Sequence, residues 1–374
     1  GICPRRALFT SLLAKTTIAW LSCTTISAAT YALLHTFDDP TPSVGDEFGS
    51  SVDIDGNLAL VGAPRDNTSG RRVGQAHLFD ITTGALLHTF DDPIGRSFCQ
   101  FGSAVARDNG RALIRGGGDD TSFPQVDQVH LFDATTGYLL NTFSDPNTTR
   151  VDHFGAALDL DGDRALIGDS SDDTIGLNVG QAHLFDVAKG TLVRTFDDPT
   201  PTGGDEFGFS VALDGDRALI GAREDNTFGG GRGKVGQAHL FDITSGVELQ
   251  RFDDPTVTTF DLFATSVVID GNWVLIGAVG DDSLDQNVGQ VHLFNTVTGL
   301  LAHTFDDPSP SVSGDFGASV ALDGNHAIVG VPGDSTHGRG VGQAHLFLIP
   351  EPCAFLLALV ASGMVPRRRR PLRS

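Results

Sequence analysis

The sequence predicts an all-β fold, a six-bladed β-propeller with four antiparallel strands in each blade. A Phe-Gly pair recurs along the chain at a nearly constant interval. Each interval contains four short segments with strand character, separated by turn residues. An extra strand precedes the first unit, and the last unit lacks one. The first strand can therefore complete the last blade and close the ring.

The repeat unit is defined by the Phe-Gly pair and by two other motifs that recur with it. The Phe positions are 53, 53, 53, 56 and 53 residues apart, and we assign the three additional residues to a loop insertion around 229–233. A Leu-Val-Gly-Ala type segment and a Gly-Gln-Ala-His-Leu-Phe type segment keep the same spacing. In the second unit Arg115 replaces the Gly of the former motif. The recurring Phe residues are Phe48, Phe101, Phe154, Phe207, Phe263 and Phe316, and Ala264 stands in place of Gly after Phe263.

Each unit contains four strand signals, which we call a, b, c and d. In the first unit they cover residues 48–54, 58–62, 75–79 and 85–90. Asp55-Gly56 joins a to b and has the composition of a two-residue hairpin turn. The segment 82–84 joins c to d in a similar way. The b–c and d–a connections are longer and rich in Asp, Gly, Ser and Pro, so each unit has the form of one propeller blade.

The ends of the repeat predict closure of the ring. A d-type strand at 31–37 precedes the first a strand, whereas the last unit runs from its c strand into Leu348-Ile349 without a d strand. We expect the N-terminal d strand to join the last blade and to cover its open edge. A linear solenoid is the alternative, but it does not account for the match between the extra strand and the missing one.

Charge and cysteine content limit the function classes. The 374 residues carry a net charge of −22, and residues 30–349 alone carry 17 basic and 46 acidic side chains, a net charge of −29. This balance excludes a nucleic-acid-binding surface, which needs clustered Lys and Arg. Cys99 is the single cysteine of this acidic part, so it has no partner there for a disulfide or a cysteine metal site.

The first 29 residues are predicted to be a secretory signal peptide. Arg5 and Arg6 form a basic start, residues 7–21 form an apolar stretch interrupted by Lys15, and Ala29 ends a small-residue segment suited to cleavage. A buried first helix is the alternative interpretation. We therefore divide the chain into the signal peptide at 1–29, the propeller at 30–349 and a tail at 350–374.

The tail has three parts in a fixed order. A Pro-Glu-Pro segment precedes an apolar stretch at 353–365 and an Arg cluster, and the apolar stretch is short for a membrane span. This arrangement resembles the PEP-CTERM sorting signal of Gram-negative bacteria. The resemblance implies export, transient membrane association through the tail, and processing by an exosortase in an exopolysaccharide-producing cell. The sorting residues are Pro350, Glu351, Pro352, Arg367, Arg368, Arg369 and Arg370.

The repeat itself resembles the FG-GAP repeat, the blade unit of the integrin α-chain head, over residues 31–348. Some members of that family bind Ca²⁺ through an Asp-rich a–b loop. Here that loop is short, and Asp159, Asp161 and Asp163 come closest to the pattern without completing it. Because Gly162 follows too early and the last ligand of the pattern is absent, these carboxylates are not expected to converge, and the hairpin-turn interpretation is favoured.

A second set of carboxylates is a candidate Ca²⁺ or other ligand site. The b–c loop of every unit has one Asp, and the d–a loops carry Asp-Asp-Pro segments. Both kinds of loop should leave a blade at the same edge, so one face is expected to be strongly acidic. Turn capping by each Asp is the interpretation we favour, and ion binding is the alternative. The b–c loop residues are Asp66, Asp119, Asp172, Asp225, Asp281 and Asp334.

The c strands carry one His in every unit, and we expect these side chains to be buried packing and hydrogen-bonding groups. No catalytic motif stands out: there is no nucleophile elbow, no zinc-protease motif and no phosphate loop. The symmetric repetition of the carboxylates also argues against a two-carboxylate glycosidase. The six residues are His77, His130, His183, His239, His292 and His345.

Together these features predict an exported, non-enzymatic propeller that acts as a binding or adhesion module at the cell surface or in the exopolysaccharide matrix. Its expected partner is a surface or matrix polysaccharide or a protein. A polysaccharide-processing hydrolase or lyase with a site in the axial channel is one alternative. A purely structural matrix protein without a specific ligand is another.

Overall fold

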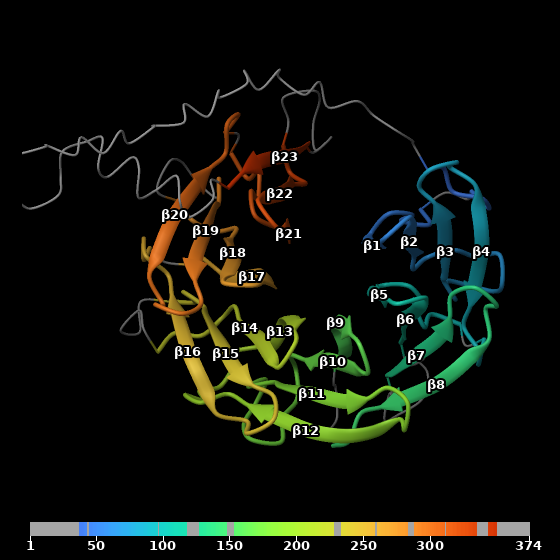
Figure 1. Cartoon of the computed structure of the whole chain (residues 1–374), viewed down its shortest axis with the longest axis horizontal. Coiled ribbons are helices and arrows are strands. Elements are labelled where there is room, and N and C mark those ends of the chain that lie inside the picture. The colour runs from blue at the N-terminus through green and yellow to red at the C-terminus, as the bar shows by residue number, and fades with distance from the viewer. Residues whose placement is uncertain are drawn as a thin grey trace, which may run out of the picture. The chain divides into compact units, whose positions relative to one another are not determined.

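The fold is a six-bladed β-propeller, seen in a computed structural model that describes ten stretches of the chain. Six antiparallel sheets surround a common axis, with the a strands innermost and the d strands outermost (Figure 1). The predicted signal peptide at 1–29, the segment 31–36, residues 229–232 of the predicted insertion and the predicted sorting tail at 350–374 lie outside these stretches. The described residues are 37–42, 45–95, 97–117, 127–147, 153–227, 233–258, 260–282, 288–310, 312–334 and 343–349.

Blades 1 to 5 have four strands each and blade 6 has three, always in sequential order. The strands are, blade by blade, β1 (Ser51–Asp55), β2 (Leu58–Ala63), β3 (Gln75–Asp80) and β4 (Leu86–Asp91); β5 (Val105–Asp108), β6 (Arg111–Gly116), β7 (Gln128–Asp133) and β8 (Leu139–Ser144); β9 (Phe154–Asp161), β10 (Arg164–Asp169), β11 (Gln181–Asp186) and β12 (Thr191–Asp197); β13 (Phe207–Asp214), β14 (Arg217–Ala222), β15 (Gln237–Asp242) and β16 (Glu248–Asp253); β17 (Phe263–Asp270), β18 (Trp273–Ala278), β19 (Gln290–Asn295) and β20 (Leu301–Asp306); β21 (Ser319–Asp323), β22 (His326–Val331) and β23 (Gln343–Leu348).

Backbone contact between neighbouring blades explains the two glycine motifs of the repeat. Gly208, in the Phe-Gly pair of blade 4, has φ +88°, and a Cβ there would lie 2.2 Å from the carbonyl oxygen of Gln181 in blade 3. A Cβ on Gly168, in the b strand of blade 3, would lie 2.0 Å from the carbonyl oxygen of Gly208. Only residues without a side chain allow two backbones to approach so closely.

Aromatic side chains connect each blade to the next. The Phe near the end of each d strand packs against the Phe of the following blade's c strand, with ring centroids 4.7–5.2 Å apart. Phe37 makes this contact with Phe79, so it occupies the d-strand position in front of blade 1. The other pairs are Phe90–Phe132, Phe143–Phe185, Phe196–Phe241, Phe252–Phe294 and Phe305–Phe347.

The prediction of six blades is confirmed, and the prediction of four strands holds for five of them. The last sheet contains β21, β22 and β23, so closure by the N-terminal strand is not observed. Of the segment 31–37, the described part is Phe37. Strand limits differ slightly from the expectation, since the first a strand begins at Ser51 whereas that of blade 4 begins at Phe207. No helix among the described residues is long and apolar enough to cross a membrane.

Candidate functional site

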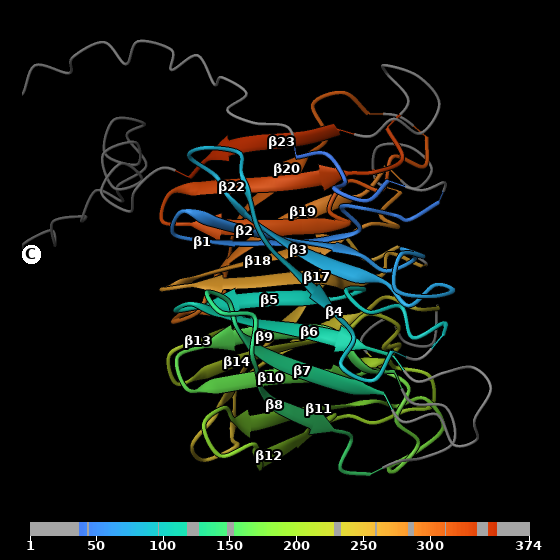
Figure 2. The same cartoon turned by 90° about the vertical axis from the view of Figure 1, so that its right-hand side faces the viewer.

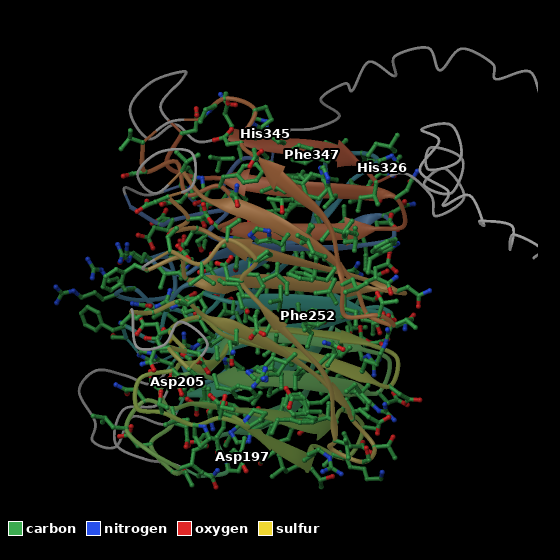
Figure 3. The ribbon with its side chains drawn as sticks, turned by 90° about the vertical axis from the view of Figure 1, so that its left-hand side faces the viewer. Asp197, Asp205, Phe252, His326, His345 and Phe347 are labelled. Atoms are coloured by element: carbon green, nitrogen blue, oxygen red, sulfur yellow. The ribbon has the colours of Figure 1, made fainter. Side chains whose placement is uncertain are left out.

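The b–c and d–a loops meet at one edge of the propeller, as expected. In an antiparallel blade both connections leave at the same end, and Figure 2 shows these loops gathered on one side. Asp205 lies toward this loop edge, whereas His326 lies toward the opposite edge (Figure 3). The carboxylates of the b–c loops are almost fully buried at Asp66, Asp172, Asp225, Asp281 and Asp334. Asp119 lies outside the described residues.

The buried b–c loop residues Asp66, Asp172 and Asp225 each cap their own turn, which is the interpretation favoured from the sequence. Asp225 Oδ1 accepts a hydrogen bond from the Thr227 backbone N at 2.6 Å, and Asp66 and Asp172 do the same two residues before a Thr. The second Asp of the Asp-Asp-Pro segments behaves alike, since Asp198 Oδ1 accepts from the Thr200 N at 2.8 Å. The Oδ2 atoms of Asp66 and Asp225 accept from a Thr hydroxyl of the d–a loop at 3.1 and 3.5 Å. The Oδ2 atom of Asp198 is buried and has no hydrogen-bond partner among the described residues.

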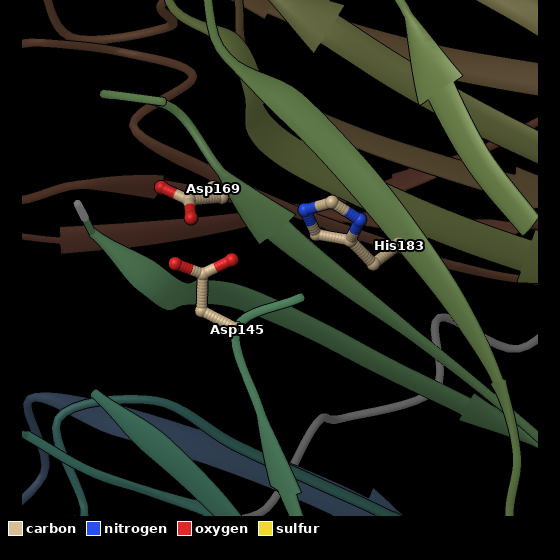
Figure 4. A group of neighbouring side chains, drawn as sticks. All are labelled: Asp145, Asp169 and His183. Atoms are coloured by element: carbon tan, nitrogen blue, oxygen red, sulfur yellow. The ribbon is translucent and has the colours of Figure 1, made fainter. Parts of the chain in front are cut away.

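The capping carboxylates also converge into compact groups. In four groups, one ligand atom from each of three side chains lies within 4.8 Å of the other two. Figure 4 shows one of them, in which the carboxylates of Asp145 and Asp169 lie next to each other beside the imidazole of His183. Blade 3 uses Asp169, at the end of β10, in place of the b–c loop residue Asp172. The groups are Asp39, Asp46 and Asp66; Asp145, Asp169 and His183; Asp198, Asp225 and His239; and Asp254, Asp281 and His292.

Five of the six His residues of the column are buried and hydrogen-bonded, as predicted, whereas His345 is half-buried. The imidazoles also lie near carboxylates of the loop edge. His292 Nδ1 lies 3.0 Å from Thr304 Oγ1 on the neighbouring d strand, and the same pairing recurs in blades 1, 2 and 3. His292 Nε2 points the other way and lies 4.0 Å from Asp254 Oδ1. Burial lowers the pKa of His292 to about 4, so the ring is neutral at pH 7.

A third carboxylate joins the groups of blades 4 and 5. Asp205 and Asp261 precede the Phe of the repeat by two residues, and both are fully buried. Burial raises the pKa of Asp205 to about 6, assisted by the neighbouring charges of Asp225 and Asp198. Burial likewise raises the pKa values of Asp254 and Asp261, which face each other. Each group therefore concentrates negative charge where solvation is poor.

The blades are not equivalent at this third position. In blade 2 it is occupied by Cys99, whose Sγ donates to Asp92 Oδ2 at 3.2 Å. Burial raises the pKa of the Cys99 thiol to about 12, so the side chain is an uncharged donor. In blade 6 the position is Gly314. The number of acidic ligands thus differs from blade to blade.

The a–b loop residues nearest to a calcium-binding pattern form contacts with neighbouring blades. Asp159 Oδ2 accepts from the Leu213 N at 2.6 Å and Asp161 Oδ2 accepts from the Gly215 N at 2.7 Å, both in the following blade. The Asp163 carboxylate pairs with Arg111 of the preceding blade at 3.2 Å. These carboxylates connect blades and diverge, so they do not fit a calcium loop.

The Asp–His groups at the loop edge are accordingly the candidate site, and they could hold metal ions such as Ca²⁺. Sequence reasoning identified Asp66, Asp225 and Asp281 but missed their combination with the His column and with Asp198 and its equivalents. A usable signal was present, because an Asp-Pro pair, the b–c loop Asp and the His recur in every unit, at the same spacing apart from the insertion in the fourth unit.

Comparison with protein families supports the repeat assignment. Four segments match the FG-GAP repeat, at residues 41–79, 142–185, 201–241 and 253–294. The matched segments include strands of blades 1, 3, 4 and 5. A search of curated proteins finds no match.

Proposed function

We propose that this FG-GAP repeat β-propeller is a non-enzymatic binding module that attaches to a polysaccharide or protein of the cell surface or the exopolysaccharide matrix. The observation that carries the proposal is the acidic loop edge, where near-equivalent blades present the same residues around one ring. A repeated surface favours a partner that is itself extended or repetitive, because several blades can bind at once.

The first Asp of the Asp-Asp-Pro segments provides the accessible part of this surface. Asp91, Asp197 and Asp306 are exposed, whereas the Asp that follows each of them is buried. Gln237 Nε2 donates to Asp253 Oδ1 at 2.6 Å, and the equivalent Gln residues hold Asp91, Asp197 and Asp306 in the same way. These carboxylates are fixed in position, which reduces the entropy lost when a partner binds.

Binding should be measured with the purified chain against a panel of surface and matrix polysaccharides, with and without EDTA. We expect binding that weakens with EDTA, because a divalent cation can bridge the acidic edge to an anionic polymer. The triple variant Asp91→Asn, Asp197→Asn, Asp306→Asn should bind at least tenfold more weakly. The matched control changes three exposed carboxylates of the opposite edge: Asp163→Asn, Asp216→Asn, Asp323→Asn.

Three outcomes would contradict this proposal. Equal loss of binding in both triple variants would show that net charge, and not the loop edge, governs attachment. Release of reducing sugar from a polysaccharide would instead favour the hydrolase or lyase alternative. No binding to any polymer or surface protein in either condition would leave the purely structural role as the better interpretation.

We further propose that a Gram-negative cell exports the chain through the signal peptide at 1–29 and sorts it through the tail at 350–374. The support is the sequence pattern at residues 1–29 and 350–374, including the Arg cluster at 367–370. Intact-mass analysis of the secreted protein should show loss of that cluster. A secreted protein that retains it would refute exosortase processing.

Closure of the ring by residues 31–37 also remains our proposal. Its support is the position of Phe37 against Phe79, which matches the d-strand contact at the other blade boundaries. Leu346 and Leu348 on β23, the outermost described strand of blade 6, are exposed by 44% and 58%, as expected of a strand that lacks its outer neighbour. Deleting residues 31–37 should lower stability and promote self-association, measured by urea unfolding and light scattering; unchanged stability would contradict closure.

A further inference from the structure

The Asp–His groups of blades 4 and 5 contain buried acceptor atoms that the described protein does not satisfy. Asp198 and His239 in blade 4 are 4% and 0% exposed, and Asp254 and His292 in blade 5 are 2% and 0% exposed. The Oδ2 atom of each Asp and the Nε2 atom of each His have no hydrogen-bond partner in the described part of the chain. An unsatisfied buried polar atom destabilises the folded state by about 1–3 kcal/mol. Four such atoms therefore indicate that a ligand binds there.

In blade 4, the hydrogen bond made by Nδ1 of the His239 imidazole shows which ring nitrogen carries the proton. His239 Nδ1 lies 2.9 Å from Glu248 Oε1. The Glu248 carboxylate can only accept a hydrogen bond, so Nδ1 carries the proton. With its proton on Nδ1, the ring presents the Nε2 lone pair toward Asp198 and Asp225. A carboxylate behind a coordinating imidazole is also the arrangement that orients His ligands in metal sites.

A cation suits the centre of this group better than a water molecule does. One ligand atom each of Asp198, Asp225 and His239 lies within 4.8 Å of the other two, so one central ion can approach all three. A water has two hydrogens for three acceptors and leaves the charge uncompensated. Among the described residues, no Lys or Arg forms an ion pair with Asp198, Asp205 or Asp225.

We propose that the Asp–His groups of blades 4 and 5 each bind one divalent first-row transition-metal ion through aspartate oxygens and the Nε2 atom of His239 or His292. Imidazole suits Zn²⁺, Mn²⁺, Fe²⁺ and Co²⁺, whereas Ca²⁺ takes six to eight oxygen ligands. The ion links the d–a loop that enters a blade to the b–c loop and c strand of that blade. This inference is independent of which partner the propeller binds.

The test uses Zn²⁺ as the probe and the full chain. Protein prepared with Zn²⁺ and dialysed into metal-free buffer is analysed for bound metal by mass spectrometry. The double variant His239→Gln, His292→Gln should lose two equivalents of Zn²⁺ relative to the wild type. Glutamine retains a donor for Glu248 and removes the imidazole ligand. The matched control His303→Gln changes a histidine outside the groups and should retain all bound Zn²⁺.

Thermal unfolding supplies a second readout that does not depend on the double variant. Zn²⁺ should raise the melting temperature of the wild type more than equimolar Ca²⁺ does, and single His239→Gln should reduce that shift. Unchanged Zn²⁺ content in the variants would overturn the proposal. So would an equal response to Ca²⁺, or wild-type protein that binds no Zn²⁺, since a water or a shared proton would then occupy the groups.

Discussion

The packing of blade against blade through glycines is testable with one substitution, Gly208→Ala. Gly208 has φ +88°, where a residue with a Cβ is strained by about 1–2 kcal/mol. The new Cβ would also lie 2.2 Å from the backbone oxygen of Gln181, which no side-chain rotation can relieve. Overpacking of this kind costs about 1–3 kcal/mol. We expect a total destabilisation of about 2–5 kcal/mol.

A matched control separates the two contributions. Gly215 lies in the a–b turn of the same blade with φ +58°, and a Cβ there would meet nothing within 4 Å. Gly215→Ala should therefore cost only the strain of about 1–2 kcal/mol. The difference between the two variants measures the close approach of blades 3 and 4.

The chain provides the reverse experiment at blade 5. Ala264 occupies the glycine position of the repeat with φ +68°. Ala264→Gly relieves the strain but increases the entropy of the unfolded chain, so we expect a net gain of about 0.5–1 kcal/mol. Free energies of unfolding from urea denaturation measure all three variants. If Gly208→Ala costs no more than Gly215→Ala, or if Ala264→Gly destabilises, the account of blade packing is wrong.

Two further predictions concern buried ionisable groups. Burial raises the pKa of Asp159 to about 7 from its ordinary 3.8. The folded state then holds the Asp159 proton more tightly than the unfolded state does. The protonated Asp159 therefore contributes to the free energy of unfolding at acid pH, and this contribution is lost as pH rises through 7. Between pH 4 and pH 8, wild type should lose up to about 4 kcal/mol relative to Asp159→Asn in urea unfolding; a constant difference would contradict the shift. Cys99 is 1% exposed and its thiol pKa is raised to about 12. Iodoacetamide should therefore label Cys99 only after unfolding, as followed by peptide mass spectrometry, and rapid labelling of the native protein would refute its burial.

Local patterns in the sequence were enough to predict the blades. The Asp-Gly turns and the alternation of short apolar segments determine the hairpins, since turn conformation and side-chain direction depend on neighbouring residues. Repetition then makes one blade a guide to the others. The same local logic predicted the capping role of Asp66 and Asp225, because an Asx turn involves residues two apart.

The candidate site could be predicted only in part, because its members come from segments that the fold brings together. Asp198 ends one blade, Asp225 lies in a loop of the next, and His239 lies on a strand beyond that loop. Each residue has a sufficient local explanation by itself, as a turn cap or a buried hydrogen-bonding group. The convergence of the Asp Oδ2 and His Nε2 atoms on one point depends on the direction of side chains from both sides of a blade boundary.

The sequence by itself therefore determined the repeat, the strand order within a blade, the turns and the acidic character of the loop edge. These follow from local conformational preference and hydrophobic periodicity. Tertiary structure alone decided which carboxylates meet an imidazole, why Asp159 and Asp161 connect blades and do not form a calcium loop, and why Gly168 and Gly208 must both lack a side chain. The physical reason is that each of these features depends on distances between residues of different segments, which only packing sets.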